Sequence, residues 1–99
     1  MGDFKFQWDK DNIGHLADHG ITPREAEQVF SHFFVERVTD PVDGEERYQA
    51  LGHTDKGRYL VIAFTERGEY IRPITGWDMK PEEYAEYVQK LIERLALPE

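Results

Sequence analysis

Apolar and polar side chains alternate at the start of the chain, and the apolar positions that follow have helical spacing. Alternation over residues 4–8 is the period of a half-buried strand. The next apolar positions share one side of a helix, which Asp9 or Asp11 can cap and which we expect to end at Gly20. Thr22, Pro23 and Glu25 then form a capping box with proline at the first helical position, so a second helix is predicted.

The pattern changes to strands in the middle of the chain. We predict strands over residues 34–38, 48–52, 58–65 and 69–75, separated by turns short enough for an antiparallel meander. Residues 58–65 are apolar on both faces, which favours a central strand. Pro73 removes a backbone donor from the last strand, so this strand is expected at an edge or at a bulge.

A final helix is predicted from about Pro81, because apolar residues recur there at helical spacing. These residues are Tyr84, Val88, Leu91, Ile92 and Leu95. The predicted fold class is α+β, with an antiparallel sheet of four to five strands. Two N-terminal helices and one C-terminal helix would pack on it.

Composition narrows the class of protein. The chain has 99 residues, which suits a single domain over residues 1–99, and it contains no cysteine for disulfides or thiolate sites. No apolar run is long enough to span a bilayer, and the first residues lack a signal-peptide core. We therefore expect a cytoplasmic protein with no membrane partner.

The net charge of −8 opposes general attraction to a phosphate backbone. The acidic excess lies in the flanks, however, because residues 45–75 carry five acids and five bases. A local basic pocket in the middle of the chain remains compatible with this charge.

Three arginines and one glutamate of this middle region are candidates for phosphate chemistry. Arginine binds phosphate oxygens with two parallel hydrogen bonds. Arg72 is expected to project from an otherwise apolar face, either toward a ligand or into a salt bridge with a glutamate. Arg47 and Arg67 either serve the same site or form solvated ion pairs. Glu66 could act as a base if it is desolvated.

Two histidines lie at the predicted end of the first helix. His19 either caps this helix end or takes part in proton transfer, with His15 one turn earlier. Histidines four residues apart are also found in metal sites, although the pattern here lacks the usual glutamate. Exposed aromatic side chains can stack on bases, and Trp77 and Lys80 in the expected loop over residues 76–80 are therefore candidates for RNA binding.

Several short motifs occur in the order seen in BrnT-like proteins, and this similarity covers residues 4–84. The motifs are Trp8-Asp9, Asp18-His19-Gly20-Ile21-Thr22, Glu25-Ala26, Val29-Phe30, Glu45-Glu46-Arg47-Tyr48, Phe64-Thr65-Glu66-Arg67 and Ile71-Arg72-Pro73-Ile74-Thr75. The resemblance implies a RelE-like fold and a bacterial type II toxin-antitoxin toxin. It implies a metal-independent endoribonuclease that acts on RNA without a cofactor and is neutralised by a cognate antitoxin. The implied catalytic residues are His19, Arg47, Glu66, Arg67 and Arg72.

Two other functions stay open from the sequence. The acidic charge also suits a catalytically inactive protein of the same fold that binds a basic protein partner. His15 and His19 leave a metal-dependent hydrolase as a further alternative. The predicted edge strand and the apolar stripe of the last helix could each join two copies into a homodimer.

Overall fold

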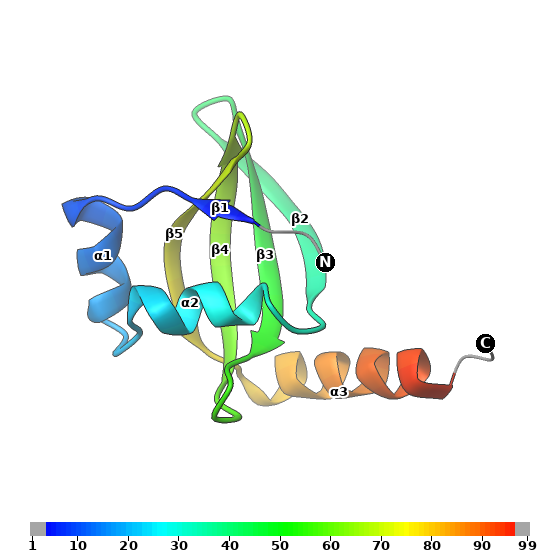
Figure 1. The fold of residues 1–99 in the computed structure, drawn as a ribbon. Helices are drawn as coiled ribbons and strands as arrows, with labels where there is room; N and C mark the ends of the chain where they lie inside the picture. The colour runs from blue at the N-terminus through cyan, green and yellow to red at the C-terminus, as the bar shows by residue number, and fades with distance from the viewer. Residues whose placement is uncertain (1–3, 97–99) are drawn as a thin grey trace.

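The computed structural model describes residues 4–96, and it contains five strands and three helices (Figure 1). In chain order the elements are β1 (Lys5–Phe6), α1 (Lys10–Ala17), α2 (Pro23–Val29), β2 (Val35–Val42), β3 (Glu45–His53), β4 (Tyr59–Arg67), β5 (Tyr70–Asp78) and α3 (Pro81–Ala96). The predicted α+β class is confirmed.

The strands form one sheet in the order β1-β5-β4-β3-β2. β4 lies in the middle, as its apolar residues on both faces predicted. The prediction of a purely antiparallel sheet is wrong, because β1 runs parallel to β5. Side-chain alternation predicts that a segment is a strand, but it does not identify the neighbouring strand.

Pro73 lies in β5 at a β-bulge. The register between β4 and β5 shifts because Phe64 pairs with Pro73 whereas Ala63 pairs with Thr75, so Ile74 is the extra residue. The bulge that Pro73 predicted is therefore confirmed, while β5 itself is covered at the edge by β1. The carbonyl of Pro73 is also used, since it accepts a hydrogen bond from Asn12 Nδ2 at 2.9 Å.

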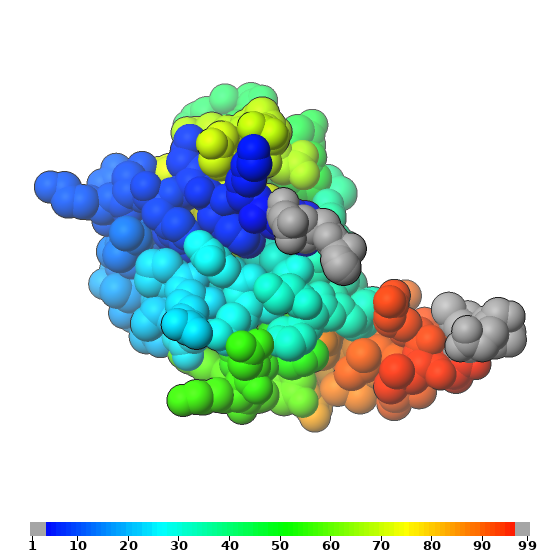
Figure 2. Space-filling model, viewed as in Figure 1, coloured from blue at the N-terminus to red at the C-terminus, as the bar shows by residue number. Residues whose placement is uncertain are grey.

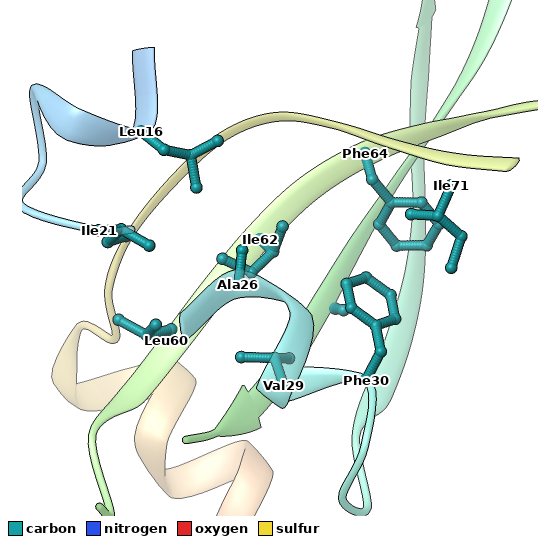
Figure 3. Close-up of a cluster of buried hydrophobic side chains, with 10 residues drawn as sticks. Leu16, Ile21, Ala26, Val29, Phe30, Leu60, Ile62, Phe64 and Ile71 are labelled. Carbon is teal, nitrogen blue, oxygen red and sulfur yellow. The ribbon is translucent and has the colours of Figure 1, made fainter. Parts of the chain in front are cut away.

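α1 and α2 cover one face of the sheet, which we call the α1–α2 face. Figure 3 shows α2 directing its apolar side chains onto β4, and the rings of Phe30 and Phe64 meet edge to face with centroids 5.2 Å apart. Leu16, Ile21, Ala26, Val29, Phe30, Ala50, Leu60, Ile62, Phe64 and Ile71 form this core. At Gly52 an added Cβ would lie 2.9 Å from Val29 Cγ1, so glycine permits the close approach of α2.

α3 packs on the opposite face, which we call the α3 face. Tyr87 is fully buried there against Leu51 and Val61. The helix contacts one end of the sheet and then projects away from it (Figures 1 and 2). As a result, Ile92 and Leu95 near its end are 56% and 76% exposed. No helix within residues 4–96 has the length and apolar character needed to cross a bilayer.

The two helix starts and the glycine stop after α1 agree with the sequence. Asp9 caps α1 and Thr22 caps α2, each in a reciprocal capping box. The glycine stop expected at Gly20 is confirmed. The last helical residue of α1 is Ala17, Gly20 has a φ of 70°, and the amides of Gly20 and Ile21 donate to the carbonyls of Ala17 and Leu16. The expected loop over residues 76–80 is corrected, since β5 continues through Trp77 to Asp78.

Candidate functional site

Arg47 and Arg67 lie on the α3 face, at the end of the sheet away from α3. Each is an even number of residues from a strand side chain that packs against α3, namely Leu51 on β3 and Val61 on β4. Glu45 lies between them. Arg67 Nε donates to Glu45 Oε2 at 2.9 Å, and Arg47 Nη2 lies 3.7 Å from Glu45 Oε1.

Arg72 reaches the same region from β5. It pairs with Thr65 of β4, two residues from Arg67, so both arginines project from one face. Arg72 Nη1 lies 2.9 Å from Asp9 Oδ2 and 3.4 Å from Gln7 Oε1. The sequence suggested a glutamate as its partner, but the structure provides Asp9 from the cap of α1.

The charges of these residues act on one another. A hydrogen bond from Arg67 holds the pKa of the Glu45 carboxyl below its usual range, and the charges of Arg47 and Arg72 act in the same direction. A hydrogen bond from Arg72 likewise lowers the pKa of Asp9. We therefore define the arginine cluster as Arg47, Arg67 and Arg72 together with the carboxylates Glu45 and Asp9.

Arg47 is the least satisfied member of the cluster. Its Nε is buried and has no hydrogen-bond partner among the described residues. Its 3.7 Å contact with Glu45 is too long for a hydrogen bond, although the charges attract. A buried guanidinium donor without an acceptor is costly, so the arrangement favours an anion beside Arg47.

Glu66 lies close to the arginine cluster in sequence but on the other face of the sheet. It pairs with Ile71, whereas its neighbour Thr65 pairs with Arg72, and successive strand residues point to opposite faces. Glu66 is exposed, and its charge helps raise the pKa of Tyr48, which is raised chiefly by burial. The structure therefore does not bring Glu66 to the three arginines.

His19 lies at the opposite end of the sheet, where Arg58 binds the turn after α1. Arg58 donates to the carbonyls of His19 and Gly20 at 3.3 and 2.7 Å. It also donates to both carboxylate oxygens of Asp78, at 2.9 and 3.2 Å. Asp78 pairs with Leu60 at this end of β4, seven residues from Arg67, which is roughly 23 Å along the strand.

The candidate RNA-binding residues also lie away from the arginine cluster. Trp77 packs against the core of the α3 face, and its Nε1 donates to Glu83 of α3 at 3.3 Å. Lys80 is exposed in the short segment between β5 and α3, and its backbone amide donates to Glu83 Oε1 at 2.8 Å. These two residues fix the start of α3 beside the sheet.

The pair His15 and His19 does not acquire further metal ligands in the described part of the chain. Among residues 4–96, no three side chains of His, Cys, Asp or Glu stand close enough together to hold a metal ion. His15 lies in the last turn of α1, while His19 follows that helix in the turn bound by Arg58. The geometry gives this corner a structural function.

The part of the sequence that forms the sheet and the arginine cluster matches a known protein family. Residues 8–83 match the family described as ribonuclease toxin, BrnT, of type II toxin-antitoxin systems. The chain belongs to the BrnT family. The matched region contains the whole arginine cluster and ends just after α3 begins, at Glu83. No curated protein matches the chain.

Sequence reasoning identified the three arginines of this BrnT family member but missed their acidic partners. The sequence points to Asp9 as a helix cap and to Glu45 as part of a glutamate pair beside Arg47, and neither is predicted as a partner in a common site. The spacing of Glu45 and Arg47 contained a usable signal, because residues two apart in a strand share a face. The contact between Asp9 and Arg72 joins residues far apart in sequence, and no local pattern predicts it.

Proposed function

We propose that this member of the BrnT family is a toxin that cleaves RNA without a metal, and that Arg47, Arg67 and Arg72 bind the phosphate at which cleavage occurs. The observation that carries the proposal is the convergence of these three arginines on one face, with a buried donor of Arg47 left without an acceptor. Cleavage by the 2′-hydroxyl of RNA increases negative charge on the phosphate oxygens. Guanidinium groups already fixed in place stabilise that charge.

His19 and Glu66 are left out of this proposed site. Each was implied as catalytic by the family resemblance, but His19 lies at the other end of the sheet and Glu66 on the other face. Charge stabilisation by positioned donors is often the largest part of catalysis. In the proposed reaction the arginines therefore stabilise the phosphate while the 2′-oxygen bonds to phosphorus and the bond to the 5′-oxygen breaks, and water takes the hydroxyl proton and protonates the departing oxygen.

The experiment compares RNA cleavage by the purified chain with cleavage by R72A, in buffer containing a chelator. We expect R72A to lose about 100-fold or more in rate. R24A is the matched control, since Arg24 is an exposed residue of α2 on the opposite side of the sheet and its loss changes the charge equally. R72K retains the charge without the forked geometry and should also be slow.

Three results would contradict this proposal. Equal rates for wild type, R24A and R72A would remove the arginine cluster from catalysis. Activity that disappears in chelator and returns with added metal would overturn the metal-independent reaction. A wild-type chain that binds an antitoxin tightly yet never cleaves RNA would favour the alternative of an inactive binding protein.

The proposed function includes a cognate antitoxin as the protein partner, because the BrnT family is described within type II toxin-antitoxin systems. A second copy of the chain is a further proposed partner, supported by the exposed Ile92 and Leu95 on α3. Sedimentation of the chain alone and with the antitoxin measures both associations. A chain that stays monomeric at high concentration would remove the homodimer.

A further inference from the structure

The two carboxylates of the arginine cluster are held in different ways. Asp9 accepts hydrogen bonds from the backbone amides of Asp11 and Asn12 at 3.0 and 3.2 Å, so it caps α1 as well as binding Arg72. Glu45 begins β3, directly after the β2–β3 turn, and its side-chain contacts are with Arg47 and Arg67. Its side chain is 31% exposed. Glu45 can therefore swing away at little structural cost, whereas Asp9 cannot.

The position that the Glu45 carboxylate occupies suits a phosphate better than it suits a carboxylate. Glu45 reaches Arg67 at hydrogen-bond distance but remains 3.7 Å from Arg47, whose buried Nε it leaves without a partner. A phosphate has more acceptor oxygens than a carboxylate and is bound by forked guanidinium donors. It could therefore serve Arg47 and Arg67 together.

We propose that Glu45 is a displaceable occupant of the phosphate position between Arg47 and Arg67. In the free protein Glu45 offsets part of the positive charge of the two arginines, and a phosphate of the RNA strand takes its place on binding. Asp9 stays in position and keeps Arg72 directed at the strand. This inference rests on the proposed function, in which the arginine cluster binds RNA phosphate, and it adds a carboxylate that competes with the substrate.

Three variants with the same change of net charge test the proposal. The probe is a fluorescent 2′-O-methyl RNA oligonucleotide, which lacks the attacking hydroxyl, and binding is measured by anisotropy. E45Q should bind the probe about three- to fivefold more tightly than wild type. E46Q should differ by less than about twofold, because Glu46 is exposed on the opposite face and salt screens its charge. D9N retains the helix cap and should bind no more tightly than wild type.

The outcomes decide between a local and a general effect of charge. Equal affinities for E45Q and E46Q, or tightening by D9N as large as that by E45Q, would overturn the proposal. Carboxyl carbon resonances of the wild-type protein provide a second measurement that does not depend on a variant. On titration with the probe, the Glu45 signal should shift while the Asp9 signal stays close to its position, and the reverse result would overturn the assignment.

The binding experiment can contradict the proposal for Glu45 without contradicting the proposed RNA cleavage, and the reverse also holds. If the chain cleaves RNA but E45Q binds the probe no more tightly than E46Q does, only the proposal that Glu45 is a displaceable occupant would be contradicted. Tighter binding by E45Q in a chain that never cleaves RNA would support the phosphate position and contradict the proposed reaction. The circular dichroism spectrum of each variant verifies that its fold is intact.

Discussion

Arginines at the two ends of the sheet differ in how many of their guanidinium donors form hydrogen bonds within the protein. Arg58 donates through all three of its nitrogens, to Asp78, to Glu25 and to the carbonyls of His19 and Gly20. The arginine cluster at the other end makes fewer hydrogen bonds and leaves Arg47 Nε without a partner among the described residues. The saturated arginine joins three segments of the fold, while the unsaturated cluster has the donors that the proposed phosphate site would use.

The difference also shows why residue type alone is a poor guide to function. Each arginine in this comparison forms at least one salt bridge, so an ion pair does not separate the two regions. The number of donors still available does separate them. Arg58 joins α2, β5 and the turn after α1, whereas Arg47 and Arg67 share a single, partly exposed carboxylate.

The largest expected effect is on RNA cleavage. R47A should lose about 100-fold or more in rate, because it removes preorganised donors from the proposed phosphate position. R58A removes the same charge at the other end and should keep a rate within about threefold of wild type per folded molecule. Single-turnover cleavage, corrected for the folded fraction, measures both. A loss in R58A as large as that in R47A would remove the distinction between the two ends.

The second effect is on stability. Here the Arg58 end should be more sensitive to substitution than the arginine cluster, the opposite of the order expected for RNA cleavage. R58A should lower the free energy of unfolding by about 2 kcal/mol, because several charge-assisted hydrogen bonds disappear and two carbonyls lose a donor. This corresponds to a fall in Tm of about 10 °C for a chain of this size. R67A should cost less than about 1 kcal/mol, since Arg67 is 48% exposed and forms a surface pair. Thermal and urea unfolding provide the comparison, and an equal loss in both variants would contradict it.

Much of the fold was predictable because it depends on local patterns. The helix caps at Asp9 and Thr22, the central position of β4 and the bulge at Pro73 follow from neighbouring residues. The parallel pairing of β1 with β5 does not, because it joins segments at opposite ends of the chain. The stop of α1 at Gly20 was also predictable, because it depends on a glycine with positive φ and on backbone hydrogen bonds within the same turn.

The candidate site was predictable in part for the same reason. The chemistry of arginine and the family resemblance identified Arg47, Arg67 and Arg72 as candidates. The position of His19 could not be read from its spacing, because it depends on which end of the sheet the turn after α1 approaches. Glu66 differs from its neighbours by one step of strand alternation, which reverses the face on which it lies.

The third effect is on the salt dependence of RNA binding. For a single strand, each phosphate neutralised by the protein contributes about 0.7 to the slope of log K against log salt. R67A should therefore bind the 2′-O-methyl RNA probe with a slope smaller by about 0.7, and R58A should leave the slope unchanged. Anisotropy titrations between low and moderate salt measure the slopes. A reduced slope in R58A would show that RNA also contacts the Arg58 end.

The smallest expected effect is on the acid dependence of stability. Hydrogen bonds from Arg58 hold the pKa of the Asp78 carboxyl below its usual value of 3.8. Because this pKa is lower in the folded chain than in the unfolded chain, the stabilisation is complete above about pH 5 and is lost as the pH falls through the folded value. D78N should therefore flatten the fall in stability between about pH 5 and pH 3, by no more than about 0.5 kcal/mol because Asp78 is largely exposed.

E45Q provides the matching measurement at the arginine cluster. The pKa of Glu45 is also lowered, chiefly by a hydrogen bond from Arg67, so its contribution disappears over the same acidic range. We expect E45Q to flatten the acid limb less than D78N does, because Asp78 binds Arg58 through two hydrogen bonds and Glu45 binds Arg67 through one. Urea unfolding at several pH values tests this order. Greater flattening by E45Q would make Glu45 a structural residue and would weaken its assignment as a displaceable occupant.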